Sequence, residues 1–128
     1  MDLVLTPARL LAAAALAALA GHASAAGNPA IGQDVFAEHC AECHSTKDGK
    51  HKKGPSLFAT LGRPAASIAA FANYSAAMKA SGKTWTPDAL DAYVTNPKAI
   101  VPGGTMKYDG LADAKARADL IAYLATLK

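Results

Sequence analysis

Two cysteines and a histidine stand together in the sequence as Cys40-Ala41-Glu42-Cys43-His44, and the chain has only these two cysteines. The C-x-x-C-H spacing is typical of covalent c-type haem attachment. Two thiols one turn apart at the end of a helix can each add to one vinyl group of a porphyrin, and the histidine that follows can ligate the iron. We therefore predict one haem c, attached through Cys40 and Cys43, with His44 as an axial ligand.

Two other kinds of site use similar residues. A thioredoxin-like dithiol needs alternating strands and helices around the cysteines, but strand signals are nearly absent from this chain. A structural zinc site needs a second pair of ligands, and the nearest completion of the set is Cys40, Cys43, His44 and His51. The context of the motif therefore favours haem over both alternatives.

A second axial ligand must come from a distant part of the chain, because the neighbours of Cys43 cannot reach the opposite face of the ring. The candidates are Met78, Met106 and His51. Met106 follows residues 102–105, Pro-Gly-Gly-Thr, where proline fixes the chain and glycine lets the backbone approach a flat cofactor. Met78 is expected to fill a core, and His51 is expected on a solvated loop among lysines. We predict Met106 as the ligand.

Four helical segments are expected to position these residues, with long loops between them. Capping residues followed by proline start helices at Asn28-Pro29 and Thr86-Pro87, and a short helical turn is expected from Ser75 to Ser81. The last helix is expected from about Asp113 to Leu127. Segments 45–73 and 98–110 are predicted to be long loops that wrap around another component of the structure. The fold class predicted is all-α.

Finer expectations concern the faces and ends of these helices. Ile31, Val35 and Phe36 are expected to form the apolar stripe of the first helix. Asn96-Pro97 is expected to end the helix that begins at Thr86-Pro87. In the last helix, Asp113 is expected to pair with Arg117 at the i+4 position.

Composition limits the classes of function. Only 6% of the residues are aromatic, so the side chains alone supply little large apolar surface, and a cofactor is expected to fill the core. The net charge is +3, which suits an acidic protein partner better than nucleic acid, because phosphate neutralisation needs a denser basic stripe.

The N-terminal segment has the features of a secretory signal. Arg9 precedes an apolar run from Leu10 to Ala20, and residues 23–25, Ala-Ser-Ala, match a signal peptidase site. The run is shorter than the ~18 residues that span a membrane. We predict that residues 1–25 are a cleaved signal peptide and that residues 26–128 are a haem domain in the periplasm.

With these residues in place, the sequence resembles class I cytochrome c, of the bacterial type similar to mitochondrial cytochrome c. Gly32 and Phe36, with Leu120 and Tyr123, match the crossing N- and C-terminal helices of that small fold. Residues 54–57, Gly-Pro-Ser-Leu, match the family's G-P-x-L loop. The resemblance implies loops wrapped around a covalently bound haem.

The resemblance also implies roles for individual residues. The Pro55 carbonyl is implied to receive the N–H of His44, and Tyr93 to hydrogen-bond the sulfur of Met106. Three residues are implied to contact the haem propionates, namely Arg63, Tyr74 and Trp85.

A pair of axial ligands, His44 and Met106, leaves no coordination site for a substrate, so we expect an electron carrier and not an enzyme. The expected function is a monomeric one-electron shuttle between membrane redox complexes, with a bc1-type donor and an oxidase or photosynthetic reaction centre as acceptor. Two groups of lysines are expected to form the basic docking face: Lys47, Lys50, Lys52 and Lys53, and Lys98 and Lys107. Asp109 is expected to weaken the charge of Lys107. The alternatives are an electron-acceptor subunit of a specific dehydrogenase and a ligand-binding or sensor cytochrome.

The signal and the attachment motif are tested together by the intact mass of the protein from its native host. The mass should correspond to a chain beginning at Ala26 plus one covalently added haem, and the added mass should be lost in a Cys40→Ala, Cys43→Ala double variant. A mass that includes residues 1–25 would contradict cleavage and favour an anchored protein.

Overall fold

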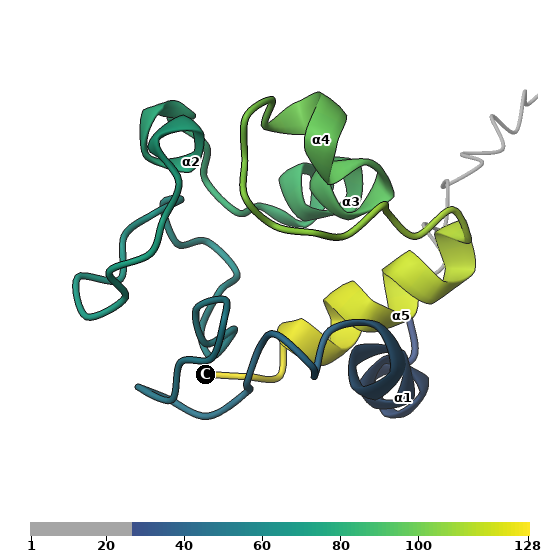
Figure 1. Cartoon of the computed structure of the whole chain (residues 1–128). Helices are drawn as coiled ribbons and strands as arrows, with labels where there is room; N and C mark the ends of the chain where they lie inside the picture. Colours follow the sequence, from purple (N-terminus) through teal and green to yellow (C-terminus); the bar gives the residue numbers. More distant parts are fainter. Residues whose placement is uncertain (1–26) are drawn as a thin grey trace, which may run out of the picture.

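A computed structural model describes residues 27–128, so the expected signal peptide and its cleavage site lie outside the described residues. Five helices follow one another in this part of the chain (Figure 1): α1 Pro29–His39, α2 Ala76–Ala80, α3 Pro87–Thr95, α4 Pro97–Ile100 and α5 Ala114–Leu124. The described residues contain no strand, only an isolated bridge between Pro64 and Thr84. The all-α prediction is confirmed.

The helix starts lie where the capping signals predict them. The Asn28 side chain accepts a hydrogen bond from the Ala30 N–H at 2.9 Å, and the Thr86 hydroxyl accepts one from the Ala89 N–H at 3.1 Å. Both bonds satisfy amide groups that have no partner inside the helix. The helical turn around Met78 is also confirmed, with Ser75 as its N-cap.

The loop expected at 98–110 begins only after residue 100, because Pro97–Ile100 form α4. Asn96 ends α3, but its side chain also accepts from the Ala99 N–H at 3.2 Å, and Pro97 supplies the first residue of α4. The signal that ends one helix therefore starts the next, because proline fits the first turn of a helix.

Two expected side-chain arrangements are also wrong. Asp113 caps α5 by accepting from the Lys115 N–H, and Arg117 instead binds Asp91 of α3 at 2.8 Å. Ile31 is 48% exposed, because α1 buries the face that carries Gly32 and Phe36. Both outcomes depend on where other helices pack.

The crossing of α1 over α5 is the largest helix contact (Figure 1). A Cβ on Gly32 would overlap the carbonyl of Asp119 and lie 2.8 Å from the Cβ of Tyr123. The rings of Phe36 and Tyr123 lie 5.9 Å apart beside this point. The crossing therefore requires glycine at position 32, as the resemblance implied.

A buried carboxylate joins the ends of the two helices. Asp119 is 2% exposed, accepts a hydrogen bond from the Asn28 N–H at 2.7 Å and forms an ion pair with Lys115. These two contacts lower the pKa of Asp119 below its usual value, because both favour the charged form. The carboxylate thus fixes the start of α1 on the surface of α5.

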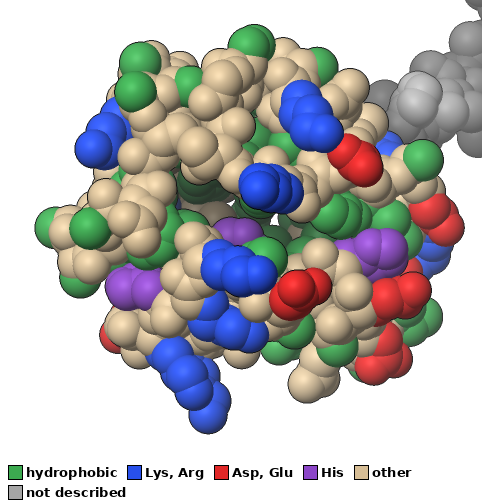
Figure 2. All heavy atoms as spheres, in the orientation of Figure 1, with side chains coloured by type: hydrophobic (Ala, Val, Ile, Leu, Met, Phe, Trp, Pro, Cys, Tyr) green, Lys and Arg blue, Asp and Glu red, His purple; other side chains and the backbone are tan. Residues whose placement is uncertain are grey.

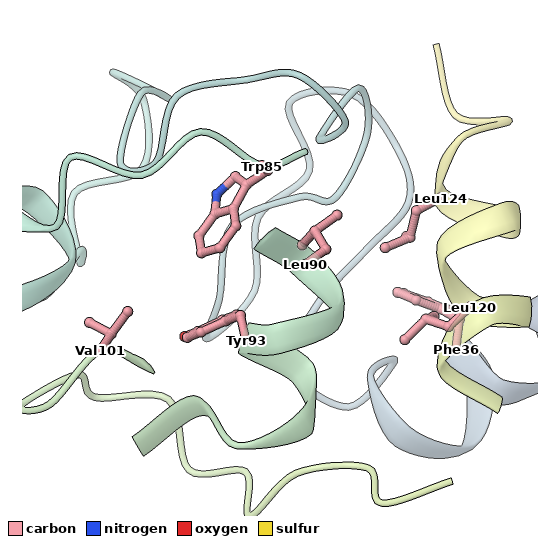
Figure 3. Packing of buried hydrophobic residues seen from close by; sticks show 7 residues of the cluster. All are labelled: Phe36, Trp85, Leu90, Tyr93, Val101, Leu120 and Leu124. Atoms are coloured by element: carbon pink, nitrogen blue, oxygen red, sulfur yellow. The ribbon is translucent and has the colours of Figure 1, made fainter. Parts of the chain in front are cut away.

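The helices and loops surround a hollow. Figure 2 shows the face of the molecule hollowed at its centre, with Lys and Arg side chains around the opening. Figure 3 shows the side chains of Trp85, Tyr93 and Val101 turned toward one another around the interior, while Phe36 and Leu120 belong to the α1–α5 contact. No helix among the described residues is long and apolar enough to cross a membrane.

Replacement of Gly32 by alanine tests the helix crossing. We expect the free energy of unfolding to fall by about 1–3 kcal/mol, because the methyl group overpacks the contact with Asp119. Thermal unfolding of the holoprotein, followed by circular dichroism, measures the change. The control is Gln33→Ala on the exposed side of the same helix, which should stay within about 0.5 kcal/mol of the parent. Equal stability of Gly32→Ala and the parent would show that the helices do not approach this closely.

Candidate haem site

The attachment motif begins where α1 ends. The Cys40 N–H donates to the Phe36 carbonyl at 2.8 Å, and the N–H groups of Cys43 and His44 both turn back to the Cys40 carbonyl, at 3.1 and 2.9 Å. The chain thus continues in a tight turn that holds both cysteines half-buried, with no disulfide between them. Burial, and then the neighbouring Cys43, raises the pKa of Cys40 to about 11, so its thiol stays protonated.

A hydrogen bond to one ring nitrogen of His44 orients the imidazole and leaves the other ring nitrogen free. Its Nδ1 donates to the Pro55 carbonyl at 2.7 Å, which leaves the lone pair of Nε2 for another partner. Burial lowers the pKa of His44, the bond to Pro55 opposes this shift, and Lys52 adds to it. The neutral imidazole, which is the metal-binding form, is therefore favoured.

Gly54 makes room for this histidine. A Cβ at position 54 would overlap the imidazole ring of His44, so the residue before Pro55 must lack a side chain. The glycine and proline of the predicted G-P-x-L loop thus act together: one admits the ring and the other supplies the carbonyl that orients it.

Met106 lies on a loop between two buried anchors, Val101 and Leu111. The Tyr93 hydroxyl donates to the Met106 sulfur at 3.8 Å, and burial raises the pKa of Tyr93, which keeps this hydroxyl a donor. An open pocket of about 490 Å³ borders Met106, and Lys98, Gly104 and Lys107 contribute to its lining. Gly103, at φ +83°, turns the chain in a conformation that favours glycine.

The other two candidate ligands have other surroundings. Met78 is half-buried against the hydrophobic core, with the Ser81 hydroxyl 4.0 Å from its sulfur, as expected for a core residue. The expectation that His51 lies on a solvated loop is wrong. Its Nδ1 accepts from the Ser56 N–H at 3.0 Å, its Nε2 is buried without a partner, and its ring lies against that of Phe71 with the ring centroids 5.6 Å apart.

Among the described residues, no group of His, Cys, Asp and Glu side chains is arranged to hold a metal ion, so the geometry does not support the zinc alternative.

The three residues expected at the propionates occupy one side of the interior. The backbone N–H of Trp85 donates to the backbone carbonyl of Arg63 at 3.0 Å, and the Tyr74 hydroxyl accepts from the backbone N–H of Ile68 at 3.3 Å. The guanidinium of Arg63 donates to the Phe58 carbonyl at 2.8 Å. Burial lowers the pKa of Arg63, and Tyr74 opposes this shift.

Sequence reasoning missed the buried hydroxyls that organise this side of the site. Ser56 and Thr60 are 2% and 3% exposed. The Ser56 hydroxyl donates to the Lys47 carbonyl at 2.6 Å, and the Thr60 hydroxyl donates to the Leu57 carbonyl at 2.7 Å. Serine and threonine are common loop residues, so nothing in the sequence distinguished these two.

The residues present fit a covalently bound haem. Cys40 and Met106, far apart in the sequence, both pack against the hydrophobic cluster that contains Trp85 and Tyr93. A half-buried imidazole with a free Nε2 and a thioether held by a hydroxyl are a nitrogen and a sulfur donor of the kind that ligates haem iron. The glycine opposite His44 and the hollow in Figure 2 supply room around these donors.

The lysines of the predicted docking face are unevenly paired. Lys98 binds Asp109 at 2.7 Å, and Lys53 lies 3.8 Å from Glu42. Asp109 weakens the charge of this face through its ion pair with Lys98, and no ion pair joins it to Lys107 among the described residues. Among residues 27–128, no ion pair involves Lys50 or Lys107.

Comparisons with known proteins agree with this geometry. Residues 27–124 match the family model described as "Cytochrome C oxidase, cbb3-type, subunit III". The chain is 45% identical over 102 residues to "Cytochrome c2" of Rhodopila globiformis, which covers 80% of this chain and 95% of the relative.

Two further relatives bear on the fold and on its length. The chain is 44% identical over 105 residues to "Cytochrome c-type cyt cy" of Rhodobacter capsulatus, covering 82% of this chain but only 52% of that longer protein. The solved structure of "cytochrome cH from Methylobacterium extorquens" superposes with a TM-score of 0.72 at 38% identity and covers 78% of this chain and 99% of the relative. By fold, by the matched residues and by these identities, the chain belongs to the class I cytochrome c family.

Proposed function

We infer that this protein is an exported, soluble one-electron carrier that moves between membrane redox complexes in the periplasm. Membership of the cytochrome c family makes it an electron carrier and not an enzyme, and implies a covalently bound c-type haem. In the finer assignment that we propose, Cys40 and Cys43 form the thioether bonds, and His44 and Met106 are the axial ligands. One observation carries the proposal: both ligand side chains are already held by a hydrogen bond, His44 by Pro55 and Met106 by Tyr93.

The bound haem supplies the one-electron chemistry, since its iron changes between the ferrous and ferric states. The chain contributes binding, orientation and shielding. His44 and Met106 would hold the iron in both states, and the thioether would raise the reduction potential. Tyr93 and Pro55 keep the two donors in place, so neither side chain has to reorganise when the charge changes. Trp85 and Val101, 8% and 3% exposed, exclude water from the interior.

Two filled axial positions separate a carrier from a ligand-binding or sensor cytochrome. Such a cytochrome leaves an iron position free for its ligand, whereas here the Met106 sulfur, which accepts a hydrogen bond from the Tyr93 hydroxyl, would fill that position. Arg63, Tyr74 and Trp85 complete the assignment as residues that receive the propionates, because their polar groups would satisfy carboxylates inside the protein.

The lysines singled out in the sequence are proposed as the docking face for a bc1-type donor and for an oxidase or a photosynthetic reaction centre as acceptor. Lys50 and Lys107 are exposed, and neither charge is paired within the described residues. Unpaired charge steers an acidic partner over a longer range than a compensated pair does. Lys50 and Lys107 should therefore contribute more to docking than Lys53 or Lys98.

The ligand assignment is tested by replacing each methionine with alanine. Met106→Ala should abolish the sulfur-to-iron charge-transfer band of the oxidised protein, lower the reduction potential and open the iron to external ligands. Met78→Ala is the matched control and should retain the band, because Met78 packs against the core. Visible spectroscopy and a redox titration give both readouts. Loss of the band in Met78→Ala alone would refute the assignment.

The docking face is tested by the rate at which a purified bc1-type complex of the native host reduces the protein. Lys107→Gln and Lys50→Gln should each slow the bimolecular reaction at low salt, and added salt should shrink the deficit as it screens the charges. Gln33→Glu changes the net charge by the same amount on exposed α1 and serves as the control. Equal rates for the three variants at low salt would show that docking does not use this face.

A further inference from the structure

A tyrosine of the Met106 loop reaches across the molecule to the helix that carries the attachment motif. The Tyr108 hydroxyl lies 3.2 Å from Nδ1 of His39, and the two rings meet edge to face with centroids 6.2 Å apart. His39 is the last residue of α1 and directly precedes Cys40. Tyr108 stands two residues after Met106. The contact therefore joins the residue before Cys40 to a residue close to Met106.

The direction of this hydrogen bond follows from the other side of the imidazole. Nε2 of His39 lies 3.9 Å from a carboxylate oxygen of Glu38, which favours a proton on Nε2. Nδ1 is then an acceptor, and the Tyr108 hydroxyl donates to it.

This bond differs from the other hydrogen bonds of the loop in what it connects. Asp109 binds Lys98 of α4, and the Met106 sulfur accepts from Tyr93 of α3. The backbone contacts of the loop also stay on that side, from Gly104 to Val101 and from Leu111 to Val94. Within the described residues, only Tyr108 and His39 hydrogen-bond segment 102–110 to segment 27–63.

The loop has little else to keep it closed. All of residues 102–105 are exposed, and between the buried anchors Val101 and Leu111 no residue is buried. The Lys98–Asp109 pair is exposed, and such pairs add little stability. A segment with few buried contacts opens at a small cost in free energy, so even an exposed hydrogen bond from Tyr108 to His39 adds measurably to what the chain contributes to its closure.

We propose that Tyr108 and His39 form a latch that holds the Met106 loop closed against the end of α1 and so keeps Met106 in its ligand position. Tyr108 and His39 act as positioning residues, and the latch rests on the proposed ligation by Met106. Loss of the hydroxyl should raise the fraction of molecules with an open loop by about two- to fivefold, the lower part of the range for one net hydrogen bond, because this bond is exposed.

The experiment uses the oxidised holoprotein and imidazole as the probe, because imidazole binds the iron only when the loop is open. Tyr108→Phe keeps the ring and removes the hydroxyl, and His39→Leu removes the acceptor. Each should raise the apparent imidazole affinity by about two- to fivefold, and the double variant should add nothing further. Hydrogen exchange of the two hydrogen-bonded amides at this loop, Gly104 and Leu111, should accelerate by the same factor, which gives a readout independent of the iron.

Two variants separate a latch from a general loss of stability. His39→Asn places a carbonyl oxygen near the position of Nδ1 and should restore the parent affinity. Tyr123→Phe is the matched control, since the Tyr123 ring packs against Phe36 and its hydroxyl has no hydrogen-bond partner among the described residues. It should leave imidazole binding and loop exchange unchanged.

The outcomes distinguish the latch from the ligand assignment. A parent protein without the sulfur-to-iron band overturns both. A parent with the band, whose Tyr108→Phe and His39→Leu variants bind imidazole and exchange amides like the parent, overturns the latch alone. A change in Tyr108→Phe that is absent from His39→Leu also overturns it, because the hydroxyl would then act through another group.

Discussion

The close approach of α1 to α5 fixes where the chemistry of this protein can take place. With no side chain at Gly32, the two helices touch through their backbones, and Asp119 ties the start of α1 to α5. Because α1 is a rigid rod that ends at His39, its angle on α5 determines where Cys40 and the turn after it lie. A contact of two backbones tolerates little sliding, since any shift would separate Asn28 from Asp119 or drive Gly32 into its neighbours.

The remaining elements depend on what they enclose more than on their own stability. Helices α2 and α4 have five and four residues, far below the ~12 residues at which an isolated helix becomes marginally stable in water. Their side-chain caps, Ser75 and Asn96, satisfy amides but do not offset the loss of chain entropy. These loops and short helices therefore have to be ordered by the interior that they surround. If a cofactor fills that interior, the chain needs few large aromatic side chains for its core.

Sequence could predict what is decided locally. The C-x-x-C-H turn, the Asn28 and Thr86 caps and the Gly54-Pro55 pair depend on neighbours along the chain, and the structure has the turn and caps where expected. The failures are tertiary. Ile31 has the right spacing for a core residue, but α5 packs on the adjacent face of α1. Arg117 has an acid at i−4, but a carboxylate of α3 is better placed. His51 lies among lysines in the sequence, but in the fold its ring packs edge to face with that of Phe71.

The two sides of the site, at His44 and at Met106, also differ in whether their contacts are local or tertiary, and so in how firmly they are held. His44 is fixed within its own segment, because its orienting carbonyl at Pro55 and the space at Gly54 come from the same stretch of chain. Met106 depends on contacts from three other elements: Tyr93 of α3, Lys98 of α4 through Asp109, and His39 of α1 through Tyr108. A half that is assembled from separate elements opens when any one of them moves, whereas a half built within one segment moves as a unit. The methionine side is therefore the side on which this fold yields first.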